Sequence, residues 1–195
     1  MKLIVVRHGE TVENTKHIMM GHMHGTLSGN GREQARAVAQ KLRKQRIDAI
    51  FSSDLGRARA TVRQIARYHK VPVVYTKALR EQNYGIFQGR PLSELIEAQE
   101  SGAARGGVAF KIPGGESRLD MMRRVRKFVK GLEVRYEGKT VLVLGHAGTV
   151  WSLISIYRHI PLGKAIKKMK PRNTGVLIMS ISNGKARVIR DDMFA

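Results

Sequence analysis

Two histidines, two arginines and one glutamate occupy positions in this chain where their side chains could act together on a phosphoryl group. Each lies shortly after a run of apolar residues, and in chain order they are Arg7, His8, Arg57, Glu81 and His146. A neutral imidazole is a good nucleophile toward phosphorus, and guanidinium groups match the oxygens of a phosphoryl group. A carboxyl group can donate a proton and recover it later. These residue types favour phosphoryl transfer, and the set requires no metal ion.

Each of these residues has a simpler explanation when it is taken alone. A single histidine after a strand can be a buried structural residue, and an arginine in the first turn of a helix can be a solvated surface group. Three different apolar runs are each followed by such residues: Arg7 and His8, Arg57, and His146. Packing alone does not explain this coincidence. Ligands of open α/β sheets bind just beyond the carboxyl ends of parallel strands. We therefore predict that these side chains share one pocket.

The elements that must position them alternate between strands and amphipathic helices. Continuous apolar runs or alternating patterns predict strands at residues 3–6, 47–51, 71–75, 140–144, 176–181 and 186–189. Apolar residues at helical spacing predict helices at residues 32–45, 58–66, 92–99, 116–136 and 150–157. Asn183-Gly184 is a strong hairpin signal, and Pro72 favours an edge position for its strand. The pattern predicts an α/β protein: a three-layer α/β/α fold with a mainly parallel central sheet.

Length and composition are those of one folded unit. The chain has 195 residues, of which 42% are hydrophobic, which is enough for a proper core. Residues 1–195 are predicted to form a single domain. Within a region of about 85–115, residues 101–115 include five glycines and one proline, so we expect a lid-like excursion there.

Several classes of protein are excluded by what the sequence lacks. There are no cysteines, which excludes disulfides, thiolate metal sites and a cysteine nucleophile. No apolar run approaches the roughly 20 residues that span a bilayer, and the N-terminal apolar segment is too short for a signal peptide. We expect a soluble, cytoplasmic protein with no membrane partner. The sequence leaves its oligomeric state unknown.

The charge of the chain favours anionic partners without naming one. Thirty-six Lys and Arg residues against 15 Asp and Glu residues give a net charge of +21. Basic residues are spread over most segments, and aromatic residues do not alternate with them as in proteins that stack single-stranded bases. A solvated basic surface is the simpler explanation. Contact with nucleic acid is possible but not favoured.

Three histidines close together, His17, His22 and His24, could suggest a metal site. They lie in a loop rich in glycine and methionine, without the regular spacing on fixed elements that metal ligands usually have. We predict no metal and no cofactor.

Five blocks of residues carry a resemblance to a known family. In order, they are Arg7-His8-Gly9-Glu10-Thr11 with Asn14; residues 53–58; Leu79-Arg80-Glu81 with Tyr84-Gly85 and Gly89; residues 113–117; and Gly145-His146-Ala147-Gly148. With these blocks the chain resembles the histidine phosphatase superfamily, also called the phosphoglycerate mutase-like family. The resemblance covers nearly the whole chain and implies a mainly parallel sheet flanked by helices.

The resemblance also implies a mechanism through a phosphohistidine. His8 would attack the phosphoryl group, while Arg7, Arg57 and His146 would hold its oxygens. Glu81 would protonate the leaving oxygen and then deprotonate the attacking water.

Two further residues would bind the substrate. Asn14 would contact the phosphate, and Ala147 stands in the last block where the family usually has a glycine. Met20-Gly21 stands where the family often has a Gln-Gly pair. None of the five blocks indicates which leaving group the substrate carries, and the lid segment from Leu92 to Phe110 is expected to decide it.

Three functions remain open at this stage. The favoured one is a metal-independent phosphomonoesterase that acts on a small phosphorylated metabolite. The second is a phosphoglycerate mutase. Evidence against it is the segment Arg90-Pro91-Leu92-Ser93, which stands where a mutase is expected to have a Gly-Leu-Asn-Lys run that supplies a lysine for the substrate. Only Arg90, Arg105 and Lys111 are nearby candidates to replace it. The third is a non-catalytic polyanion-binding module, although none of the catalytic residues is missing.

Overall fold

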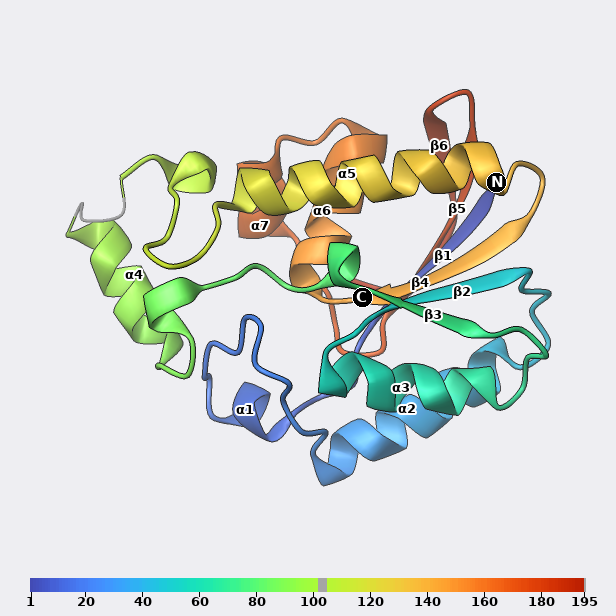
Figure 1. The fold of residues 1–195 in the computed structure, drawn as a ribbon, viewed down its shortest axis with the longest axis horizontal. Helices are drawn as coiled ribbons and strands as arrows, with labels where there is room; N and C mark the ends of the chain where they lie inside the picture. The colour runs from blue at the N-terminus through green and yellow to red at the C-terminus, as the bar shows by residue number, and fades with distance from the viewer. Residues whose placement is uncertain (102–104, 195) are drawn as a thin grey trace.

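The computed structural model describes residues 1–101 and 105–194 and contains one six-stranded sheet (Figure 1). Its strands are β1 (Lys2–Arg7), β2 (Ala49–Ser53), β3 (Val73–Thr76), β4 (Thr140–Gly145), β5 (Val176–Ser182) and β6 (Lys185–Asp191). The order across the sheet is β3-β2-β4-β1-β5-β6. Pairing is parallel from β3 to β1 and antiparallel at β5 and β6. The prediction of a mainly parallel α/β sheet is confirmed.

Helices cover both faces of this sheet, which gives the predicted three layers (Figure 1). The α-helices are α1 (Val12–Thr15), α2 (Gly29–Leu42), α3 (Gly56–Ala66), α4 (Leu92–Glu100), α5 (Arg118–Arg135), α6 (Ala147–Arg158) and α7 (Leu162–Lys168). Short 3-10 turns are η1 (Lys77–Leu79), η2 (Gly85–Phe87) and η3 (Gly107–Ala109). No helix within residues 1–101 and 105–194 has the length and apolar character needed to cross a membrane.

The alternation along β1 explains why the sheet needs two helical layers. Leu3 and Val5 point into the core shared with α5 and α6, while Ile4 and Val6 point into the core shared with α2 and α3. All four side chains are fully buried. A strand that is apolar on both faces is stable only between two layers, so this strand lies in the middle of the sheet.

Local signals in the sequence act as their residue types indicate. The hydroxyl of Ser28 accepts a hydrogen bond from the Gly31 N–H and caps α2 at its start. Asn183 and Gly184 both have positive φ, as a tight hairpin between β5 and β6 requires. β3 is an edge strand, as Pro72 suggested, although it starts at Val73 rather than at residue 71.

Some predicted boundaries are wrong. α5 begins at Arg118 and not at 116, because Ser117 is its capping residue. α6 begins at Ala147 and not at 150, so the last sequence block runs from the end of β4 at Gly145, through the capping residue His146, into the first turn of α6. α1 and α7 lie where the sequence indicated only loop and connection. α7 buries just two of its residues, Leu162 and Ala165, which is too weak a pattern to detect.

The region 85–115 forms a small unit beside the main sheet, seen with α4 at the left of Figure 1. Its own apolar cluster contains Met19, Phe87, Leu95 and Ile112. Residues 102–104 of the expected excursion lie outside the described residues. The structure thus separates this unit from the two large cores, and its action as a lid stays a prediction.

Candidate active site

The carboxyl ends of β1, β2 and β4 converge on one cavity of about 360 Å³. Arg7 is paired with Gly145 across the parallel strands β1 and β4, so the residues that follow them, His8 and His146, are neighbours. The His8 N–H donates to the Gly145 carbonyl oxygen at 3.0 Å. The strand register alone therefore brings the two histidines together.

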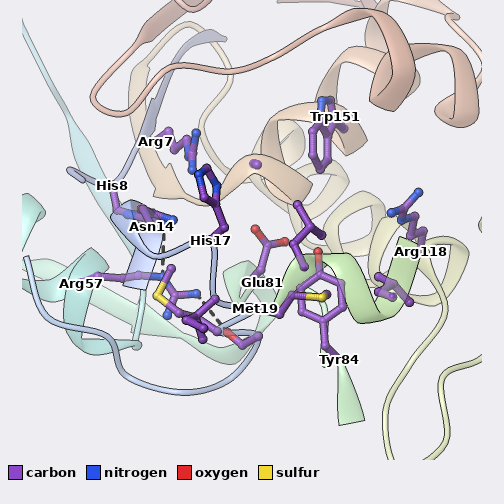
Figure 2. A pocket seen from close by; sticks show the side chains of 16 residues that line it. Arg7, His8, Asn14, His17, Met19, Arg57, Glu81, Tyr84, Arg118 and Trp151 are labelled. Carbon is purple, nitrogen blue, oxygen red and sulfur yellow. Dashed lines mark hydrogen bonds between the residues drawn. The ribbon is translucent and has the colours of Figure 1, made fainter. Parts of the chain in front are cut away.

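All predicted site residues except His146 line this cavity: Arg7, His8, Asn14, Arg57, Glu81 and Ala147. His146 lies behind the wall, with its ring centroid 5.1 Å from that of His8. Figure 2 shows Arg7, His8, Asn14 and Arg57 on one side of Glu81. We call this side the phosphate end.

His8 is held as a neutral imidazole whose unprotonated nitrogen, Nε2, faces the Arg57 guanidinium. Its Nδ1 lies 2.7 Å from the Gly9 carbonyl oxygen, so Nδ1 carries the proton and donates it. The Nε atom of Arg57 donates to Nε2 at 3.3 Å, which requires a lone pair on Nε2. Burial, and then the charges of Arg57 and Arg7, hold the pKa of His8 well below its usual value. At neutral pH the side chain is therefore an uncharged nucleophile.

Arg57 is buried and fixed by backbone carbonyl groups. Its Nη1 donates to the carbonyl oxygens of Met23 and His24 at 2.6 and 3.3 Å, and its Nη2 to that of Gly21 at 3.0 Å. Burial lowers the pKa of Arg57 to about 10, so the guanidinium stays charged at neutral pH. This places a fixed positive charge beside the nucleophile.

His146 has one nitrogen satisfied and one without a partner. Its Nε2 lies 2.9 Å from the Ser53 hydroxyl, which itself accepts from the Leu55 N–H. When the hydroxyl donates its proton to Nε2, the ring proton lies on Nδ1. No described residue accepts from this buried Nδ1. A phosphoryl oxygen would supply the missing acceptor.

Arg7 and Asn14 present donors on the same side. The Nη1 of Arg7 donates to the Pro171 carbonyl oxygen at 2.5 Å, while its buried Nε has no partner among the described residues. The Oδ1 of Asn14 accepts from the Thr11 N–H at 3.2 Å, which leaves its amide N–H groups for a ligand. Ala147 has only a methyl side chain, so what it can offer is its backbone N–H at the start of α6.

Glu81 lies at the centre of the cavity and is only 9% exposed. Its carboxylate accepts from the Gln82 N–H at 2.9 Å and from the Gly148 N–H at 3.3 Å. A Cβ atom on Gly148 would lie 2.3 Å from a carboxylate oxygen, so only glycine permits this approach. The geometry suits an acid that delivers a proton to a group bound next to it.

The loop that carries Glu81 is held by Arg124 of α5, a residue that the sequence did not reveal. Its guanidinium donates to the carbonyl oxygens of Ala78, Arg80 and Glu81 at 2.8 to 2.9 Å. It also pairs with Glu116 at 2.6 Å. Its only signal was a place among the many basic residues of this helix, so no pattern distinguished it.

The other end of the cavity includes two residues that sequence reasoning missed, Arg118 and Trp151. Tyr84 and Arg118 lie beyond Glu81 in Figure 2, with Trp151 above them, and all three line the cavity together with Leu92 and Leu95 of α4. We call this side the leaving-group end. Arg118 directly follows a recognised block, and that adjacency was the one available signal.

The cations considered as stand-ins for a mutase lysine are not cavity residues. Arg90 pairs with Glu94 at 3.0 Å on the surface. Arg105 and Lys111 are exposed and do not line the cavity. The extra cation found there is Arg118.

The histidine loop supports the site instead of forming a separate one. His17 lines the cavity, the Nε2 of His22 lies 3.0 Å from the Glu81 carbonyl oxygen, and the Nδ1 of His24 accepts from the Gly56 N–H at 3.2 Å. Within the described ranges, no three His, Cys, Asp or Glu side chains are grouped as metal ligands would be.

Comparison with known proteins places this geometry in context. A family model described as "Histidine phosphatase superfamily (branch 1)" matches residues 3–191. A relative from Yersinia enterocolitica, named probable phosphoglycerate mutase GpmB, is 32% identical over 176 residues, covering 89% of this chain and 81% of the relative. The structure of the alpha-ribazole phosphatase from Shigella flexneri is similar with a TM-score of 0.87 and 25% identity, covering 98% and 96% of the two chains. The mycobacterial glucosyl-3-phosphoglycerate phosphatase is similar with a TM-score of 0.84 and 26% identity, covering 98% of each chain.

Proposed function

Since the chain belongs to the histidine phosphatase superfamily, we propose that it is a metal-independent phosphomonoesterase that hydrolyses a small phosphorylated metabolite through a phosphohistidine. The family and the structural neighbours place it among the phosphoric monoester hydrolases. The observation that carries the proposal is the state of His8. Its protonated Nδ1 is tied to Gly9, and its Nε2 lone pair is next to a buried guanidinium.

In the first step, Nε2 of His8 forms a bond to phosphorus while the bond from phosphorus to the leaving oxygen breaks. Glu81 gives its proton to that oxygen, so an alcohol departs and a carboxylate remains. Arg7 and Arg57 balance the charge on the phosphoryl oxygens, and Nδ1–H of His146 donates to one of them. A positioned acid of this kind contributes roughly 100- to 10,000-fold to the rate.

In the second step, the Glu81 carboxylate removes a proton from a water molecule, which attacks phosphorus as the bond to His8 breaks. Inorganic phosphate leaves, and Glu81 is again protonated for the next cycle. Asn14 and the backbone at Ala147 hold the phosphate during both steps. We propose that α4 and its flanking turns close over the cavity and leave room for this water.

A phosphoglycerate mutase is the second candidate, because that is the name of a relative at 32% identity. A mutase must keep water from the phosphohistidine while an intermediate with two phosphates turns over. The cavity has a volume of about 360 Å³, at the lower end of the range for ligand pockets. Among the described residues that line it, Arg118 is the one lysine or arginine outside the phosphate end. These features favour hydrolysis.

The test is a panel of phosphorylated metabolites assayed for released phosphate in the presence of a chelator. A parallel assay follows interconversion of 2- and 3-phosphoglycerate, with and without 2,3-bisphosphoglycerate as primer. We expect phosphate release that the chelator does not suppress. Fast interconversion with little free phosphate would reassign the chain as a mutase.

A further inference from the structure

Arg118 is a cation in the cavity wall without a counter-ion. Within the described residues, its side chain forms no salt bridge, and no hydrogen bond of its guanidinium is found. The acids nearest to it in the chain are already engaged. Glu116 pairs with Arg124 at 2.6 Å, and Asp120 pairs with Arg123 at 3.0 Å.

The surroundings of Arg118 show which part of the cavity its charge faces. It is the first residue of α5, next to Tyr84, and it lines the cavity on the side away from His8 (Figure 2). Trp151 stands in the same wall, fixed by a 2.8 Å hydrogen bond from its Nε1 to the Met169 carbonyl oxygen. The leaving-group end is thus a largely apolar and aromatic chamber with one free guanidinium at its edge.

The two ends of the cavity therefore bind different chemical groups of a ligand. The phosphate end has donors and charge for one phosphoryl group. A leaving group at the other end of the cavity contacts aromatic side chains and the Arg118 guanidinium, whose N–H donors have no partner among the described residues. A neutral alcohol would leave that charge uncompensated, whereas an anionic group would pair with it.

We propose that Arg118 is a specificity residue that selects substrates whose leaving group carries a second anionic group, a carboxylate or a phosphate. This inference rests on the proposed phosphomonoesterase function. With a cavity of about 360 Å³, the substrate class is a small phosphorylated acid or bisphosphate.

The experiment compares substrates in matched pairs that differ in the second anionic group. For a carboxylate, the pairs are 3-phosphoglycerate with glycerol 3-phosphate, and phosphoserine with phosphoethanolamine. For a phosphate, the pair is fructose 1,6-bisphosphate with fructose 6-phosphate. The wild type should prefer the anionic member in kcat/KM by about tenfold or more, the scale of a hydrogen bond to a charged group. The carboxylate and phosphate arms show which group is recognised.

Arg118→Ala should abolish this preference through KM, and Arg118→Lys should restore part of it. Arg126→Ala is the matched control, because Arg126 is an exposed arginine on the same helix that does not line the cavity. Equal treatment of both members by the wild type would overturn the inference. So would a loss of the preference in Arg126→Ala, or an equal loss for both members in Arg118→Ala.

Binding separates this inference from the proposed hydrolysis. Calorimetry on His8→Ala and on His8→Ala/Arg118→Ala gives Kd for 3-phosphoglycerate and glycerol 3-phosphate without turnover. A preference present in the first variant and lost in the second supports the role of Arg118 even if no phosphate is released by the wild type. Hydrolysis without any such preference would support the enzyme and overturn the role of Arg118.

Discussion

The two ends of the cavity are built in different ways. At the phosphate end, His8, Arg57 and His146 are 2%, 1% and 0% exposed and follow strands of the central sheet. At the leaving-group end, Leu92 is 43% exposed, and Tyr84, Arg118 and Trp151 are half-buried. The helix above them, α4, rests on an apolar cluster of its own.

This difference separates the reaction from the choice of substrate. Side chains locked by a sheet and by buried hydrogen bonds hold the geometry that bond breaking requires. Short elements such as α4, which pack on a small apolar cluster, open at a low cost in free energy and can accommodate substrates of different shape. We expect changes at the phosphate end to remove catalysis, and changes at the leaving-group end to alter recognition.

His8→Ala is the strongest test of the phosphate end. We expect kcat to fall by roughly 10,000-fold or more, as happens when a nucleophile is removed. The wild type, but not the variant, should yield an acid-labile, base-stable phosphoenzyme. Circular dichroism should show an intact fold in the variant. Robust turnover by this variant would mean that His8 is not the nucleophile.

Glu81→Gln keeps the shape of the side chain and removes its acid. With alkyl phosphates, kcat should fall by roughly 100- to 10,000-fold. With p-nitrophenyl phosphate, the rate at which the first equivalent of nitrophenolate is released should fall far less than this, because that leaving group needs no proton. Rapid-quench measurements of the first turnover compare the two substrates. An equal loss with both would show that Glu81 acts in another way.

Arg124→Met tests whether the acid loop depends on its clamp. The variant leaves three carbonyl oxygens and Glu116 without their partner, which should reduce the free energy of unfolding by about 1–3 kcal/mol. The loosened Glu81 should also lower kcat more than it raises KM. Arg123→Met is the control on the same helix, since Arg123 is exposed and, within residues 1–101 and 105–194, pairs only with Asp120. Unchanged kcat in Arg124→Met would assign the placement of Glu81 to other contacts.

The sequence predicted which residues lie together at the phosphate end, because most of them directly follow strands of the sheet. Arg7, His8 and His146 follow continuous apolar runs, and such strands place their carboxyl ends at one edge of a sheet. Arg118, Trp151 and Arg124 could not be predicted in the same way. Their roles depend on where α5 and α6 lie against the acid loop, which is a tertiary arrangement without a local pattern. The short helices α1 and α7 were missed because they bury too few residues to give an apolar pattern.

Leu95→Ala probes the leaving-group end. Leu95 is 3% exposed in a cluster with few members, so its truncation should destabilise α4 by about 2 kcal/mol or more. Amide hydrogen exchange should become faster in α4 and stay unchanged in β1. KM should rise several-fold while kcat changes little. An equal acceleration of exchange in both elements would show that the two ends unfold together.

Acid should destabilise the phosphate end through its neutral histidines. Burial, and then the charge of Arg57, lower the pKa of His8 and of His146 well below 6.5. Below pH 6.5, His8 and His146 therefore bind protons in the unfolded chain but not in the folded chain. The free energy of unfolding falls as the pH falls. The slope is at most about 1.4 kcal/mol per pH unit for each histidine.

His8→Gln should make this slope shallower between pH 6.5 and 5, as followed by urea denaturation. His159→Asn is the control, because His159 is exposed and asparagine tolerates its left-handed backbone. A slope that is the same in the wild type and in His8→Gln would show that His8 does not contribute to the acid sensitivity.

The way Arg57 is held has a consequence for how this protein can diversify. Its partners at Gly21, Met23 and His24 are main-chain oxygens, which every amino acid provides. Most positions in that loop can therefore change their side chains without moving the guanidinium. The exceptions include Gly21 and Gly25, which have positive φ, and His24, whose side chain accepts from the Gly56 N–H next to Arg57. An inserted or deleted residue would shift all three oxygens at once, so libraries that seek new substrates should vary the composition of this loop and keep its length.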